Sequence, residues 1–157
     1  MVIKSFRGQM ADNTVDQISL HTINGSMGYR IKSFIGISSA PGAQDMEGLF
    51  KIFKVPKTIS EIDGNVDFSD NTLLGVVYFK DYATNDNQPS VQTVIFDNET
   101  FNQDIFITYS DVRSNNSGSY YFELEQVKLS LDENTVATLK DIRNIESSKN
   151  KWVNNII

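Results

Sequence analysis

The sequence predicts an all-β fold: a single-domain β-sandwich or jelly roll of about eight to nine antiparallel strands, followed by a C-terminal tail. Three observations predict it. Apolar and polar residues alternate with period two, whereas helical periodicity is poor throughout. Turn-forming Asn, Asp, Gly, Ser and Pro separate the apolar runs. No amphipathic segment between these runs resembles the crossover helix that an α/β fold requires. We assign residues 1–145 to the sandwich and 146–157 to the tail.

The first half of the chain contains four predicted strands. The first, 14–23, places Ile18 and Leu20 on one face. The second, YRIKSFIGI, alternates most clearly and is expected to place five side chains on one face, namely Tyr29, Ile31, Ser33, Ile35 and Ile37. The third and fourth, 48–55 and 73–80, are apolar on both faces, which is typical of buried strands.

The second half contains four more predicted elements. The run 91–96 is also expected to be buried on both faces. The strand 104–110 alternates, and the strand 120–131 changes phase after Leu124, which predicts a β-bulge there. For 135–145 the pattern fits a strand or a short helix, and we favour the strand.

Composition limits the classes of function. The chain has 157 residues, enough for one domain with a substantial core, and its ten Phe and six Tyr without any Cys predict aromatic packing in place of disulfides. A net charge of −6 argues against sequence-independent nucleic-acid binding. The N-terminal residues contain no signal-like apolar region, and no stretch approaches the length of a membrane span. We therefore expect neither nucleic acid nor membrane as a partner.

The acidic stretch DNETFNQDIFITYSD, residues 97–111, poses the question of an enzymatic site. A catalytic carboxylate pair needs two acids held close together, one of them with a raised pKa. A turn in water provides no desolvation to raise that pKa. We therefore predict a turn followed by a strand, with Ile105, Ile107 and Tyr109 on one side and Phe106 and Thr108 on the other.

Other candidate sites are weak. The loop 60–71 offers hard oxygen ligands of the kind that Ca²⁺ takes, from Asp63, Asn65, Asp67 and Asp70, but it lacks the spacing of a helix–loop–helix calcium site. His21 is the only histidine, and no motif of a nucleophilic, phosphate-binding or zinc enzyme is present. We predict a protein that is not an enzyme and has no cofactor, with a solvated acidic loop.

The tail SSKNKWVNNII contains the only Trp of the chain, within an apolar group formed by Trp152, Val153, Ile156 and Ile157. This segment either folds back onto the sandwich or forms an arm that docks into a neighbouring subunit. Large aromatic side chains are favoured as interface anchors. We name these four residues as the candidate interface.

Three segments, FNQDIFITY, YYFELEQVKLS and TLKDIRNI, follow one another in the last third of the chain. In this order they resemble segments of small β-rich proteins of marine tailed phages that are uncharacterised or virion-structural. The resemblance implies a capsid-associated or other virion structural protein and brings no functional residues with it. It also implies viral structural proteins as partners, homo-oligomerisation, and a location in the virion after assembly in the host cytoplasm.

Two functions are therefore in competition. The first is a virion structural protein that decorates or joins a capsid or a tail through protein–protein contacts. The second is a lectin-like sandwich that binds carbohydrate, with calcium assistance from the acidic loop and contacts from Tyr29, Tyr82 or Trp152. A third, a small glycosidase, requires a carboxylate pair that the sequence does not identify.

Overall fold

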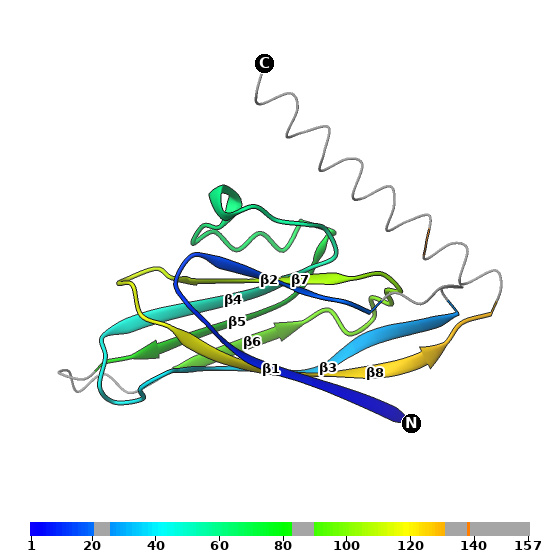
Figure 1. The fold of residues 1–157 in the computed structure, drawn as a ribbon, viewed down its shortest axis with the longest axis horizontal. Coiled ribbons are helices and arrows are strands. Elements are labelled where there is room, and N and C mark those ends of the chain that lie inside the picture. The colour runs from blue at the N-terminus through cyan, green and yellow to red at the C-terminus, as the bar shows by residue number, and fades with distance from the viewer. Residues whose placement is uncertain (21–25, 83–89, 131–137, 139–157) are drawn as a thin grey trace, which may run out of the picture.

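The computed structural model describes residues 1–20, 26–82, 90–130 and 138, and it confirms the all-β prediction (Figure 1). Two antiparallel sheets pack against each other. Sheet A has three strands in the order β1 (Val2–Met10), β8 (Gly118–Lys128) and β3 (Met27–Ser38). Sheet B has five, in the order β2 (Thr14–Ile18), β7 (Ile105–Asp111), β4 (Met46–Phe53), β5 (Leu73–Asp81) and β6 (Val91–Ile95).

Three of the four strand pairs of an eight-stranded jelly roll are present. The first strand pairs with the last, β2 pairs with β7, and β4 pairs with β5, as expected when a long antiparallel ribbon is wrapped into two layers. The remaining pair, β3 and β6, is joined by a hydrogen bond from Thr93 Oγ1 to the Phe34 carbonyl at 3.4 Å. The backbone ladder of β6 is made with β5 instead.

Aromatic rings fill the space between the two sheets, as the composition predicted. Phe50 is at the centre, with its ring centroid 4.5 Å from that of Tyr109, 5.8 Å from Tyr120 and 6.2 Å from Phe79. Phe34 and Phe122 meet edge to face at 6.1 Å. These contacts join residues from both sheets, so the rings hold the layers together.

A second, smaller cluster lies on the outer face of sheet B. It contains Leu49, Phe53, Val55, Leu73 and Val76. Since both faces of β4 and β5 are buried along most of their length, the prediction of doubly apolar strands there is confirmed. The connection between these two strands includes a short 3₁₀ helix, η1 (Ile59–Glu61).

The side-chain orientation predicted for β3 is wrong beyond Ile31. The register of β3 against β8 shifts between Ile31 and Ser33, so Lys32 is an extra residue in the strand. Phe34 is therefore buried, while Ile35 and Ile37 point outward and are 54% and 52% exposed. The bulge predicted in β8 is absent there, since β8 pairs without interruption with β1.

Other differences concern the edges of the sheets. Strand β1 was not predicted, and β6, predicted to be buried on both faces, is a largely exposed edge strand with Val91 59% exposed. The predicted strand 135–145, apart from Thr138, and the whole tail 146–157 lie outside the described residues.

Candidate functional site

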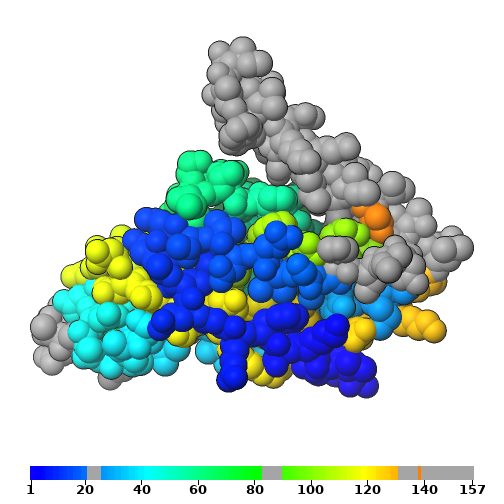
Figure 2. All heavy atoms as spheres, viewed as in Figure 1, coloured from blue at the N-terminus to red at the C-terminus, as the bar shows by residue number. Residues whose placement is uncertain are grey.

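The outer face of sheet A carries the best candidate for a functional surface. The antiparallel register places residues of β1, β8 and β3 side by side in rows across the sheet. One row consists of Arg7, Tyr121 and Ile35, and the next of Gln9, Ser119 and Ile37. Strand β1 lies at the surface of the molecule along its length, in dark blue in Figure 2.

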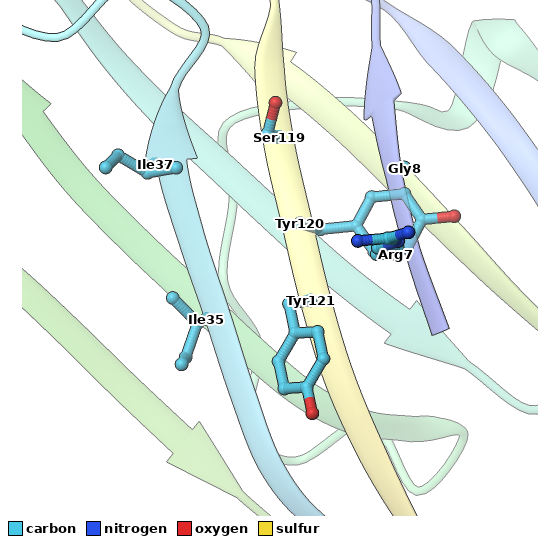
Figure 3. Close-up of a pocket in the computed structure, with 7 residues that line it drawn as sticks. All are labelled: Arg7, Gly8, Ile35, Ile37, Ser119, Tyr120 and Tyr121. Atoms are coloured by element: carbon cyan, nitrogen blue, oxygen red, sulfur yellow. The ribbon is translucent and has the colours of Figure 1, made fainter. Parts of the chain in front are cut away.

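An open hollow of about 500 Å³ lies over these rows. Figure 3 shows its lining on three adjacent strands: Arg7 and Gly8 on β1, Ser119, Tyr120 and Tyr121 on β8, and Ile35 and Ile37 on β3. At Gly8 a Cβ atom would lie 2.9 Å from the Tyr120 hydroxyl oxygen. Glycine at this position therefore lets the Tyr120 ring pack directly against β1.

The apolar part of this surface comes from the bulge in β3. Because Lys32 is inserted, Ile35 and Ile37 lie on the solvent side and expose about half of their surface each. Two neighbouring β-branched side chains on an outward face form a small apolar patch. Bulges commonly re-aim side chains in this way at functional sites.

The polar part of the surface includes Tyr121, whose hydroxyl is held by a hydrogen bond, and the cation of Arg7. The Tyr121 hydroxyl donates to Glu123 Oε1 at 2.7 Å, and this hydrogen bond raises the pKa of Tyr121. Farther along the face, Glu125 binds Arg30 at 3.2 Å and Lys32 at 3.5 Å. Within the described residues, Arg7 has no hydrogen bond or ion pair of its own.

This combination is suited to binding. Tyrosine and arginine are enriched among the residues that dominate interface energies, and aliphatic neighbours exclude water from around them. We refer to Arg7, Ile35, Ile37 and Tyr121 together as the sheet A patch. The sequence does not indicate this patch, because its pattern shows neither the bulge that turns Ile35 and Ile37 outward nor the strand β1.

The acidic stretch is a turn followed by a strand, as predicted, and its carboxylates have structural partners. Asp104 accepts hydrogen bonds from Gln17 Nε2 and from the Leu20 backbone, both at 2.8 Å. Glu99 Oε2 lies 2.7 Å from the buried ammonium of Lys54. The acids therefore tie together β2, β7 and the loops around them.

Asp111 is the most connected of these acids. Its carboxylate accepts backbone hydrogen bonds from Glu47, Arg113, Ser114 and Asn116 at 3.0–3.1 Å. Burial raises its pKa, but the four N–H donors outweigh burial, so the pKa of Asp111 lies below its ordinary value. The carboxylate organises the loop between β7 and β8.

The candidate metal ligands do not converge on one point. The Lys51 ammonium donates to the backbone carbonyls of Asp63 and Asn65 at 3.3 and 2.9 Å, and lies 3.2 Å from Asp63 Oδ1. Asp67 accepts from Ser69, and Asp70 accepts from Thr72, each within its own turn. A protein cation therefore already binds the oxygens of the first two candidates.

The remaining candidates separate into three groups. Tyr29 is 1% exposed, so it does not offer the carbohydrate contact that the lectin-like alternative expected of it. Tyr82 is partly exposed, donates to Glu47 Oε1 at 2.6 Å and lies under the Arg113 guanidinium at 4.7 Å. His21 and the tail residues Trp152, Val153, Ile156 and Ile157 lie outside the described residues.

The described residues contain no group of three or more His, Cys, Asp or Glu side chains positioned to share a metal ion. No helix in the same part of the chain is long and apolar enough to cross a membrane.

Comparison with known proteins adds little. No protein-family model and no curated protein matches the chain. A solved structure of Bacillus endospore appendages, described as a family of disulfide-linked pili, is similar over 82% of this chain and 88% of that chain, at 12% identity and a TM-score of 0.37. A likeness of this strength carries no functional argument, and the present chain has no cysteine with which to form a disulfide.

Proposed function

We propose that this chain is a non-enzymatic structural protein that assembles with other protein subunits, and that the sheet A patch is one of its contact surfaces. The observation that carries the proposal is the outward placement of Ile35 and Ile37 beside Tyr121 and Arg7. A strand bulge that moves two isoleucines from the core side to the solvent side gives up core burial. Contact with a partner would again remove these two side chains from water.

At the finer level we propose a virion component associated with a capsid shell or a tail, with viral structural proteins and further copies of the chain as partners. The resemblance of the last third of the chain to phage proteins supports this assignment. The jelly-roll pairing is compatible with it, because viral capsid domains use this architecture, but lectin domains use it too. The fold alone therefore does not choose between the two functions.

The carbohydrate-binding alternative has lost two of its supporting features. Tyr29 is buried, and the oxygens of Asp63 and Asn65 bind Lys51. Assembly through the sheet A patch is therefore the function that the geometry supports best.

Light scattering of the purified protein over a range of concentrations tests the proposal. We expect Ile37→Asp to weaken self-association about tenfold or more, since it removes roughly 1 kcal/mol of apolar burial and places a charge in the contact. Val91→Asp is the matched control, because Val91 is equally exposed but lies on β6 of the other sheet. A wild-type protein that stays monomeric at every concentration, alone and with its virion partners, would contradict the proposal.

A further inference from the structure

The hollow over the sheet A patch lacks an occupant among the described residues. Its two isoleucines remain about half exposed, and the Arg7 guanidinium has no partner in the described part of the chain. The hollow is open to solvent, and its volume of about 500 Å³ leaves room for a large side chain laid against the sheet. An occupant should therefore offer a large apolar group and tolerate a neighbouring cation.

One segment of this chain has matching chemistry. Residues 146–157 carry Trp152, Val153, Ile156 and Ile157, and Trp152 is the only tryptophan of the protein. An indole ring packs well against isoleucine side chains, and a guanidinium over its face gains a cation–π attraction. The lysines at 149 and 151, next to the tryptophan, are complementary in charge to Glu123 beside the hollow.

The exit point of the chain lies at the opposite end of β3 from the hollow. Thr138 accepts a hydrogen bond from Asn102 Nδ2 at 2.7 Å, and the preceding Phe101 pairs with Tyr29 near the start of β3. The hollow lies at the other end of this strand, six residues and about 20 Å away. In a head-to-tail arrangement, the exit end of one copy adjoins the hollow of the next.

The segment is long enough to reach the hollow. Trp152 follows Thr138 by fourteen residues, which span up to about 45–50 Å when extended. A reach of this size exceeds the roughly 20 Å from the exit point to the hollow of the same chain, so the choice of a neighbouring copy as receiver rests on the proposed assembly function.

Building on the proposed function, we infer that residues 146–157 form an arm that docks into the hollow of a neighbouring copy, with Trp152 packed between Arg7, Ile35 and Tyr121. The contact is heterologous, because the arm and the hollow are different surfaces of the same chain. Repetition of such contacts produces rings or open filaments instead of closed dimers.

Tryptophan fluorescence tests this arm directly, since Trp152 is the only tryptophan. We expect acrylamide to quench the fluorescence of Trp152 about twofold or more weakly in the full-length wild-type protein than in Ile35→Asp. The hollow of Ile35→Asp cannot accept an indole. Val91→Asp, altered at an equally exposed position on β6, should match the wild type.

Mixing two full-length variants distinguishes neighbouring copies from the same chain. Ile35→Asp keeps the arm but has a defective hollow, whereas Trp152→Ala keeps the hollow but emits no tryptophan signal. If the arm crosses between copies, adding excess Trp152→Ala should restore the shielding of Trp152 in Ile35→Asp. Circular dichroism of each variant confirms that the fold is retained.

Three results would overturn the inference. Equal accessibility of Trp152 in the wild type and in Ile35→Asp would show that the arm does not occupy the hollow. Suppose that Ile35→Asp exposes Trp152 to acrylamide and that adding Trp152→Ala does not restore the shielding. The arm would then dock within its own chain. Self-association that survives Trp152→Ala but is lost in Ile37→Asp would reject the arm and leave the proposed assembly function intact.

Discussion

At the scale of single residues, buried charges hold the loops of this protein in place. Lys54 is 1% exposed, and its ammonium lies 2.7 Å from the Glu99 carboxylate on the loop between β6 and β7. Lys51 binds the loop between β4 and β5 through three oxygens. Removing one partner of a buried pair leaves an uncompensated charge, which costs more than the pair itself contributes.

We therefore expect different costs from the two halves of the Lys54–Glu99 pair. Glu99→Gln leaves the Lys54 ammonium buried without its carboxylate and should lower the free energy of unfolding by about 2–4 kcal/mol. Lys54→Met removes the buried charge, keeps the length of the side chain and should cost less. Urea denaturation of both variants compares them. A larger loss for Lys54→Met would contradict this interpretation of the pair.

The carboxylate of Asp111 predicts a dependence of stability on pH. Its pKa is lowered in the folded state, so its stabilisation is complete above the unfolded value near 3.9 and is lost as the pH falls through the folded value. Asp111→Asn should cost about 1–3 kcal/mol at pH 7 because four backbone donors lose their anion.

The stability difference between the wild type and Asp111→Asn should then shrink as the pH falls below about 4. Thermal unfolding of both proteins from pH 7 to pH 2 measures it. A difference that stays constant over this range would show that the ionisation of Asp111 is not coupled to folding.

The sequence showed where acids lie but not what they bind. It placed Asp104 and Asp111 correctly at the two ends of a strand. Their partners come from β2 and Leu20, from Glu47 and from the loop after β7, and they are up to 87 residues away in the sequence. Partners so distant depend on the packing of the two sheets, and no local pattern indicates them.

At the scale of secondary-structure elements, the bulge in β3 decides which residues face the core. The sequence YRIKSFIGI alternates without a break, so period two predicted one apolar face. In the structure Phe34 packs against Phe50 and Phe122 instead, at centroid distances of 6.4 and 6.1 Å. One inserted residue therefore suffices to bury Phe34 and to turn Ile35 and Ile37 outward.

Deleting Lys32 tests this view of β3. Without the extra residue, either the register with β8 slips or Phe34 leaves the core, and we expect a loss of about 3–5 kcal/mol in unfolding free energy. Lys32→Ala keeps the bulge and removes only an exposed ion pair with Glu125, so it should cost less than about 1 kcal/mol. Guanidinium denaturation measures both. A deletion variant as stable as Lys32→Ala would refute the role of the bulge.

The strand that was not predicted, β1, lies at the edge of sheet A. The sequence located β4 and β5 because both of their faces are buried, which favours continuous apolar runs, and it located β7 by alternation. Strand β1 has a partner on one side only, and Lys4, Ser5 and Arg7 interrupt its apolar residues. Charged residues on an edge strand disfavour uncontrolled pairing, and they also weaken the pattern by which a strand is recognised.

At the scale of the whole molecule, the two sheets differ in how much of their outer surface is covered. The loop between β4 and β5 and its small apolar cluster pack on the outer face of sheet B. The outer face of sheet A instead presents the sheet A patch and its hollow. The outer face of sheet B is therefore covered by a loop of the same chain, whereas the outer face of sheet A presents the patch for contact. This difference is the basis of the proposed assembly.

Fold class and function differed in how far the sequence could determine them. Turn residues and alternation are local, and they predicted the two-layer fold and most strands. The sheet A patch combines residues from three strands that lie up to 114 positions apart, as Arg7 and Tyr121 do. Its composition depends on strand order and on the bulge, so it emerged only from the structure.

Hydroxyl-radical footprinting at low and high protein concentration tests the central claim most directly. We predict that oxidation of Tyr121 and Ile35 falls about twofold or more as the protein assembles, while that of Val91 and Phe68, which are exposed elsewhere, does not change. Unchanged labelling of the sheet A patch in a sample that has assembled would contradict the account.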